Sequence, residues 1–291
     1  MKYGPGPVMR SAGLVLGLLL AGENVVHAEP KTDGSVAAEL PADHESRELE
    51  RTNAAWLLSE MAISGVVVGT IFVLSRDAPD HCDWCKSNGF DDAFRVSFLS
   101  SSPRKPGVAS DILVGMVPAL TAGALMAPAF SAGRHDHAAQ NLAIAASATG
   151  IAVAMALASK DLIARPRPGQ YHGVLDKTIA EGNPDERFVS FYSGHTAAVF
   201  AMASSTATLA YMRGYDSAPY IALVGGLLGF STGLLRISAD MHWATDALVG
   251  AVSGTAVGIA LPLLAHPRKR SPVIVTPLVG SVTGLSASGS F

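Results

Sequence analysis

The chain has 291 residues, of which 49% are hydrophobic and only 15% are charged, and its mean hydropathy is +0.32. Its low charge and positive mean hydropathy predict a membrane-embedded or tightly packed helical protein. The formal net charge of -3 gives no electrostatic attraction for nucleic acid, which we exclude as a partner.

The first 28 residues have the order of a secretory signal peptide. Lys2 and Arg10 precede the apolar stretch AGLVLGLLLAG, and the sequence VHA ends at Ala28. This apolar core is too short to span a bilayer. We expect cleavage before Glu29, which would start the mature chain outside the cytoplasm. An uncleaved anchor is the alternative. Residues 29–52 are polar and charged and are expected to form a tether or a short surface helix.

Six apolar segments follow, and their length of about 18 to 24 residues favours helix over strand. They lie at residues 54–75, 109–130, 137–159, 195–212, 219–236 and 242–265. The sequence therefore predicts an all-α fold, an up-and-down bundle of about six apolar helices within one domain, residues 53–268. The tail, residues 269–291, has β-branched runs broken by Gly and Pro and is expected to be extended or a weak hairpin.

The two cysteines of the chain, Cys82 and Cys85, lie in the sequence DHCDWCKSNGF between the first two apolar segments. In an oxidising compartment this spacing favours a short structural disulfide. A redox motif would need a βαβ context, which is not seen here. Two thiols beside His81 make only part of a zinc site, which is the less favoured alternative.

Two of the predicted helices carry a glycine at every fourth position. These glycines are Gly225, Gly229 and Gly233 in one helix and Gly250, Gly254 and Gly258 in the next. Stripes of small residues let helix backbones approach closely. If the two helices pack face to face, they deliver Arg236 and His242 to one end of the bundle, on rigid elements.

The sequence KDLIARPRPGQ closes the third apolar segment. Lys160 lies in the last expected helical turn, and Pro166 and Pro168 end the helix and hold Arg165 and Arg167 in an extended path. Taken alone, basic residues at this position are explained by the helix dipole.

The sequence SFYSGHTAAV opens the fourth apolar segment. Ser193 is a plausible N-cap, Gly194 permits close backbone approach, and His195 falls in the first helical turn. Taken alone, this is an ordinary helix start.

Connectivity changes the interpretation, because an up-and-down bundle brings the ends of these helices together. The residues expected to converge are Lys160, Arg167, Ser193, Gly194, His195, Arg236, His242 and Asp246. Cations, a hydroxyl and helix N-termini form a cradle for a tetrahedral oxyanion. Asp246 lies four residues after His242, so it is expected to accept the imidazole N–H and leave the other nitrogen free as a nucleophile.

The three blocks resemble the type-2 phosphatidic acid phosphatase superfamily, which also contains bacterial acid phosphatases and vanadium haloperoxidases. Its signature is Lys, six residues, Arg-Pro; then Pro-Ser-Gly-His; then Ser-Arg, five residues, His, three residues, Asp. The matching stretches here are KDLIARPRP, YSGH and LRISADMHWATD, within residues 109–265. Tyr192 replaces the Pro and Leu235 replaces the Ser, which puts loop shape and substrate fit in question more than activity.

The resemblance implies a role for each residue of the cradle. His242 would attack phosphorus to form a phosphohistidine, and Asp246 would orient it. His195 would protonate the leaving oxygen and then activate water. The residues implied to bind the phosphate oxygens are Lys160, Arg167, Ser193, Gly194 and Arg236. The resemblance implies that no metal or other cofactor is needed, and that vanadate would bind as a phosphate mimic.

We therefore expect a metal-independent phosphatase acting on phosphate monoesters or pyrophosphates, with lipids favoured as substrates. Phosphatidic acid, phosphatidylglycerophosphate and polyprenyl pyrophosphate represent the substrate types. The alternatives are a soluble periplasmic non-specific acid phosphatase, a vanadium haloperoxidase, for which the chain leaves little room, and a non-catalytic membrane protein. The last of these would not need both histidines and Asp246.

The expected topology contains a conflict. A signal cleaved before Glu29 followed by six spans would place Lys160 in the cytoplasm. The basic residues Arg134 and Arg213 and the sequence HPRKR instead favour a site on the opposite side. We expect a membrane-associated protein of the bacterial cell envelope whose site faces the periplasm, with the number of crossings open. Asp240 is expected to be a solvated loop residue.

Overall fold

The computed structural model describes residues 54–74, 79–131, 133, 135–173, 187–266, 274–278 and 284–288. The predicted signal peptide and the polar segment 29–52 lie outside the described residues, as do Arg134 and most of the sequence HPRKR.

Eight helices are found in this part of the chain. They are α2 (Ala54–Leu74), α3 (Gly89–Phe98), α4 (Arg104–Ser131), α5 (His135–Ile163), α6 (Pro168–Tyr171), α8 (Gly194–Met212), α9 (Ala218–Ser238) and α10 (Ala244–Ala265). The six long helices coincide with the six predicted segments to within a few residues, so the predicted all-α bundle is confirmed. The short helices α3 and α6 were not predicted.

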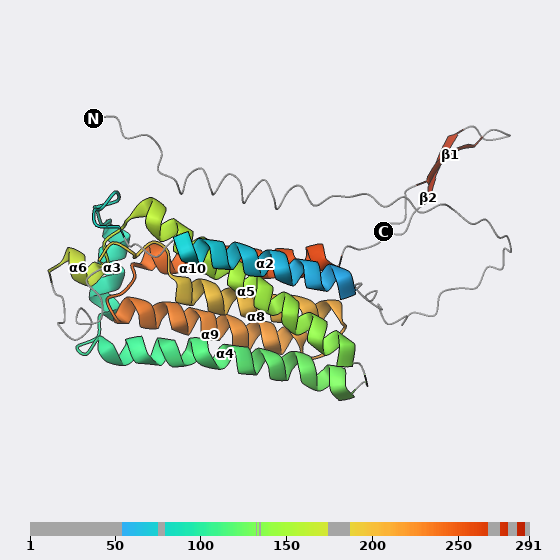
Figure 1. Cartoon of the computed structure of the whole chain (residues 1–291), viewed down its shortest axis with the longest axis horizontal. Coiled ribbons are helices and arrows are strands. Elements are labelled where there is room, and N and C mark those ends of the chain that lie inside the picture. The colour runs from blue at the N-terminus through green and yellow to red at the C-terminus, as the bar shows by residue number, and fades with distance from the viewer. Residues whose placement is uncertain are drawn as a thin grey trace.

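The long helices run up and down, and the connections that carry the motifs lie at one end of the bundle (Figure 1). We call this end, which also carries α3 and α6, the site end. Helix α8 is the central element and contacts α4, α5, α9 and α10. Alanines such as Ala197, Ala201 and Ala210 are completely buried on it, because a small side chain lets four neighbours approach one helix.

The two glycine stripes pack against α8 and not against each other, which corrects the predicted face-to-face packing of α9 and α10. A Cβ added at Gly254 would lie 2.3 Å from the carbonyl oxygen of Ala197, and one at Gly225 would lie 2.6 Å from the Cβ of Ala203. Both glycines are therefore required by close approach to α8. Arg236 and His242 still lie at one end of the bundle, because α9 and α10 both pack against α8.

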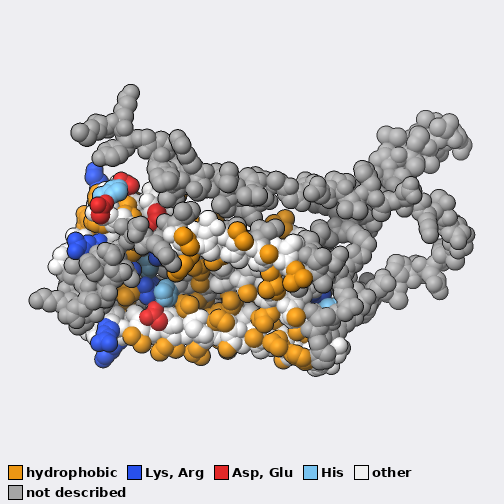
Figure 2. Space-filling view, in the orientation of Figure 1, with side chains coloured by type: hydrophobic (Ala, Val, Ile, Leu, Met, Phe, Trp, Pro, Cys, Tyr) orange, Lys and Arg blue, Asp and Glu red, His pale blue; other side chains and the backbone are white. Residues whose placement is uncertain are grey.

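On the face of the bundle seen in Figure 2, apolar side chains extend along the helices and charged side chains gather at the site end. Within the described part of the chain, four stretches are long and apolar enough to cross a membrane: Arg104–Ser131, His137–Tyr171, Ala218–Ser238 and Ala244–Ala265. Large apolar side chains such as Phe230, Val252 and Leu264 are more than half exposed. These features support the predicted association with a membrane.

Two strands lie in the C-terminal tail. β1 (Ile274–Leu278) pairs with β2 (Gly284–Ser288) in an antiparallel register that places Ile274 opposite Ser288. This agrees with the extended tail that the β-branched sequence predicts.

Candidate active site

The nucleophile predicted from the sequence, His242, lies in the turn between α9 and α10 and is 2% exposed. Burial lowers the pKa of its imidazole well below the ordinary value, and the positive charges of Arg236, Arg167 and Lys160 lower that pKa further. The three predicted cations, which come from α9, from the segment after α5 and from α5, therefore converge on this histidine. A neutral imidazole is the form that can attack an electrophile.

The orientation of His242 differs from the expected one. Its Nδ1 lies 2.7 Å from the carbonyl oxygen of Ser190 and 4.0 Å from Oδ2 of Asp246. Because a carbonyl oxygen only accepts, this bond assigns the proton to Nδ1 and leaves Nε2 with its lone pair. The predicted direct hydrogen bond to Asp246 is replaced by one to the backbone of Ser190.

Asp246 is completely buried at the start of α10 and accepts several hydrogen bonds. Its Oδ1 is 2.5 Å from a guanidinium nitrogen of Arg165, and its Oδ2 accepts from the Ser190 hydroxyl at 2.5 Å and from the Trp243 backbone N–H at 3.0 Å. The last bond caps the helix. Asp246 thus acts on His242 through Ser190, whose hydroxyl it fixes and whose carbonyl holds the imidazole.

His195 lies in the first turn of α8, as predicted, and meets a residue that the sequence analysis missed. Its Nε2 is 2.8 Å from Oδ1 of Asp111 on α4, and the same oxygen is 3.3 Å from the guanidinium of Arg236. The Asp111 side chain is 59% exposed. A carboxylate therefore lies between the predicted acid and one predicted phosphate ligand, at the open side of the site.

Ser193 is the N-cap of α8, which confirms that interpretation of the sequence. Its hydroxyl accepts from the backbone N–H of Thr196 at 3.4 Å and lies 2.9 Å from the Thr196 hydroxyl, and the residue is fully buried. At Gly194, an added Cβ would meet Ala156 at an ordinary 3.7 Å. Packing alone does not demand a glycine there.

The segment after α5 is extended, as its prolines predict. Arg167 has φ -64° and ψ 149°, and its backbone N–H donates to the carbonyl oxygen of Arg187 at 3.1 Å. Trp243 fixes the same segment by donating from its indole to the carbonyl oxygen of Pro166 at 2.9 Å. The segment is thereby attached to the start of α10.

Asp240 is buried, and the expectation of a solvated loop residue is wrong. Its two carboxylate oxygens accept from the Arg95 side chain at 2.7 and 2.8 Å, and its φ is +58°. Arg95 lies on the unpredicted helix α3. This ion pair fixes the turn that carries His242 to α3.

Tyr192, the first departure from the family signature, is 5% exposed and packs in an apolar cluster with Ala152, Ala156, Ala197 and Ala201. It therefore belongs to the core of α5 and α8. Nothing in the structure explains why Leu235 replaces a serine.

Cys82 and Cys85 form a disulfide with their Cα atoms 5.5 Å apart. The backbone N–H groups of Asp83 and Trp84 donate to the carbonyl oxygens of Ala164 and Ile163, both at 3.3 Å. The disulfide loop is therefore fastened to the end of α5, at the site end.

Among the residues that the structure describes, no group of three or more His, Cys, Asp or Glu side chains is arranged to hold a metal ion.

Comparison with known proteins gives two matches. Residues 141–270 match the family model described as PAP2 superfamily, and this range contains all three sequence blocks. A lipid A 1-phosphatase from Porphyromonas gingivalis is 39% identical over 69 residues, which cover 24% of this chain and only 15% of that protein. No solved structure matches the chain. The resemblance found from the three blocks is thereby confirmed.

Proposed function

We propose that this chain, whose residues 141–270 match the PAP2 superfamily model, is a metal-independent phosphatase that hydrolyses a phosphate monoester or pyrophosphate of a membrane lipid through a phosphohistidine. One observation carries the proposal. The buried His242 donates a hydrogen bond from Nδ1–H to a backbone carbonyl. Three cations, Arg236, Arg167 and Lys160, act electrostatically on its imidazole. The partial match to a lipid A 1-phosphatase supports a lipid phosphate as the substrate type.

The proposed reaction has two steps. Nε2 of His242 attacks phosphorus while the bond to the leaving oxygen breaks, and His195 gives that oxygen a proton. Water then attacks the phosphohistidine, His195 takes a proton from the water, and phosphate leaves with the imidazole restored. Lys160, Arg167 and Arg236 would neutralise the phosphate oxygens in both transition states, which is where phosphoryl transfer needs stabilisation.

The test of this chemistry is turnover by the purified full chain of lipid phosphates, soluble phosphomonoesters, and halide with peroxide. We expect lipid phosphate hydrolysis that chelators leave unchanged and that vanadate inhibits competitively, since vanadate mimics the trigonal-bipyramidal transition state. Metal dependence that persists after repurification would refute the proposal. Preference for soluble esters would indicate a non-specific acid phosphatase, and halide oxidation with vanadate would indicate a haloperoxidase.

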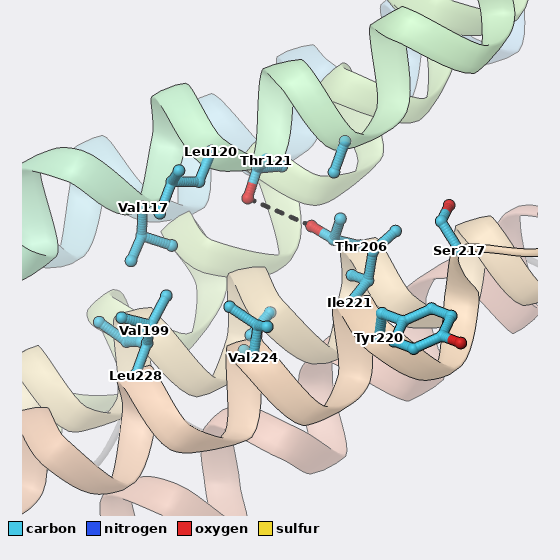
Figure 3. Close-up of a pocket in the computed structure, with 13 residues that line it drawn as sticks. Val117, Leu120, Thr121, Val199, Thr206, Ser217, Tyr220, Ile221, Val224 and Leu228 are labelled. Atoms are coloured by element: carbon cyan, nitrogen blue, oxygen red, sulfur yellow. Dashed lines mark hydrogen bonds between the residues drawn. The ribbon is translucent and has the colours of Figure 1, made fainter.

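A groove between α4 and α9 supports a lipid substrate. Its volume is about 260 Å³, and its lining is almost entirely apolar, with Val117 and Leu120 of α4 facing Val224 and Leu228 of α9 over α8 (Figure 3). The hydrogen bond between Thr121 and Thr206, 3.3 Å long, removes two hydroxyls from its wall.

The groove lies on the same two helices that carry the phosphate end of the site. Arg236 lies about two turns after Leu228, the last α9 residue of the groove, which is roughly 12 Å along the helix. Asp111 is a similar distance from Val117 on α4. We infer that an acyl chain lies between α4 and α9 while its phosphate is held by Arg236.

Filling the groove tests this inference. Val224→Trp should lower kcat/KM for long-chain substrates by about tenfold, since each lost methylene contact costs about 0.8 kcal/mol. Turnover of a short-chain phosphate should stay within twofold. Leu227→Trp is the control, because Leu227 is equally exposed on α9 and lies outside the groove. Equal loss in both variants, or with both chain lengths, would contradict the inference.

We further propose that the site end faces the periplasm. The disulfide lies at this end, against the last residues of α5. Disulfides persist in oxidising compartments and are reduced in the cytoplasm, which supports the periplasmic orientation.

This orientation sharpens the conflict in the predicted topology. Four residues separate α2 from the described start of the disulfide loop, so α2 ends at the site end (Figure 1). If α2 spans the membrane, a periplasmic site places Ala54 on the cytoplasmic side. Release of a mature chain at Glu29 into the periplasm is then incompatible with a periplasmic site.

Thiol labelling of spheroplasts tests whether the site end faces the periplasm or the cytoplasm. We expect a membrane-impermeant maleimide to label Cys82 and Cys85 in intact spheroplasts, and only after reduction. The mass of the purified chain would then show an uncleaved leader. Labelling that requires permeabilisation would place the site in the cytoplasm.

A further inference from the structure

Three charged side chains form a continuous buried chain beneath the proposed nucleophile. Arg165 binds Asp91 of α3 at 2.7 Å with one guanidinium nitrogen and Asp246 of α10 at 2.5 Å with another. Their side chains are 1% exposed or less. We call Asp91, Arg165 and Asp246 the buried triad. Only Asp246 occupies a named position of the family signature, whereas Arg165 falls among the six unspecified residues of the first block and Asp91 lies outside all three blocks.

The triad is closely bonded by its surroundings. Asp91 accepts from the Thr245 backbone N–H at 2.8 Å and from the Thr245 hydroxyl at 2.9 Å, and it accepts from the Asn88 amide at 2.6 Å. The Trp84 ring covers the guanidinium of Arg165 at 4.2 Å. Such bonding to charged groups fixes the positions of the two carboxylates and of the guanidinium.

The triad carries one net negative charge, because two carboxylates surround one guanidinium. Asp246 presents that charge 4.0 Å from Nδ1 of His242 and holds the hydroxyl of Ser190, whose carbonyl accepts the imidazole proton. When Nε2 bonds to phosphorus, the imidazole becomes positively charged. A fixed charge of -1 beneath it stabilises that form, while a charge of -2 would invite protonation of a carboxylate and loss of the geometry.

We propose that Asp91 and Arg165 are positioning residues for phosphoryl transfer, and that they set both the place and the net charge of the carboxylate behind His242. The inference rests on the proposed phosphohistidine function. Neither residue reaches the phosphate, so their effect falls on the rate of the chemical steps and leaves substrate binding unchanged.

Charge balance provides the test. Asp91→Asn makes the triad neutral, Arg165→Gln makes it doubly negative, and the two changes together restore -1. We expect kcat to fall by about tenfold to a hundredfold in each single variant with KM within twofold of wild type. The double variant should regain at least about tenfold in kcat over Arg165→Gln, an outcome that the loss of packing alone does not produce.

Two further variants keep the test decisive if Arg165→Gln folds poorly. Arg165→Lys retains the net charge and should keep more activity than Asp91→Asn, whose net charge differs. Asp92→Asn is the matched control on α3, because its side chain is partly exposed and bonds Ser87 and not the triad. It should leave kcat and KM unchanged. Values of kcat and KM are measured in the steady state on the monodisperse fraction, and phosphoenzyme formation is followed in single turnovers stopped with alkali.

The outcomes separate the inference from the function on which it rests. If wild type yields no acid-labile, alkali-stable phosphoenzyme with any lipid phosphate, the phosphohistidine proposal fails. If wild type yields it and Asp91→Asn forms it as fast as Asp92→Asn, the role of the triad is refuted. Losses in the two single changes that simply multiply in the double variant would also refute it.

Discussion

Two arginines fasten the two ends of this bundle, one through carboxylates and the other through hydrogen bonds that include side-chain amides. At the site end, Arg165 lies between the carboxylates of Asp91 and Asp246. At the opposite end, Arg213 follows α8 and donates to the neutral side chains of Gln140 and Asn141 on α5, at 2.9 and 3.0 Å.

This difference suggests distinct roles for the two arginines, one in holding helices together and one in the proposed reaction. Hydrogen bonds from an arginine to amide oxygens bury no negative charge on the acceptor. Burying two carboxylates costs desolvation free energy that the ion pairs offset only when the geometry is good. Fastening alone does not account for this cost at the site end. In the proposed mechanism, these carboxylates would stabilise the positive charge that develops on His242.

The largest loss of activity is expected from a substitution at His242, at the site end. His242→Ala removes the nucleophile and should lower kcat by about four orders of magnitude or more. The bundle should stay folded, because the Ser190 carbonyl that loses its partner can be reached by a water in the space left by the ring. Single-turnover assays and circular dichroism provide the measurements. Activity within tenfold of wild type would contradict the assignment of the nucleophile.

A smaller loss of activity is expected from a substitution at Arg236, which also lies at the site end. Arg236→Lys keeps the charge and loses the planar fork that, in the proposed mechanism, would bind two phosphate oxygens, so kcat/KM should fall by about a hundredfold. Steady-state kinetics on the preferred lipid phosphate gives the value. A loss below threefold would mean that this arginine contributes only charge.

Asp111 should show a still smaller effect. Asp111→Asn removes the charge that holds His195 at 2.8 Å but keeps an acceptor oxygen, so kcat should fall by about tenfold. The loss should be smaller for a substrate whose leaving oxygen needs no proton, such as a nitrophenyl phosphate. Equal losses for both kinds of leaving group would exclude a role in orienting the acid.

The sequence was sufficient for the helices and for the convergence of the three blocks. Each apolar run is long enough to be a helix, and alternation of direction alone brings Lys160, His195 and His242 to one end. The glycine stripes were less informative about packing. A period of four residues identifies the face of a helix that packs closely, but it does not identify the neighbouring helix. Both stripes face α8, which packs against α9 and against α10.

The sequence was insufficient for the residues that support His242. Asp91 and Thr245 are 154 residues apart, and Asp240 and Arg95 are 145 residues apart. No local pattern links such pairs. Asp111 is the one acidic residue of α4, and its relation to His195 depends on how that helix is rotated. Ser190 acts partly through its backbone carbonyl, for which no side chain gives a signal.

The smallest effect is expected at the opposite end. Arg213→Lys loses the fork that joins Gln140 and Asn141 and should destabilise the fold by about 1 to 2 kcal/mol. For a domain of this size the melting temperature should fall by about 2 to 8 °C. Both kcat and KM should stay within twofold, because Arg213 lies at the far end of α8 from His195. Thermal unfolding and steady-state kinetics on one preparation measure both quantities. A tenfold loss of kcat at an unchanged melting temperature would mean that the amide-bonded arginine also serves the reaction, and the distinction between the two ends would no longer hold.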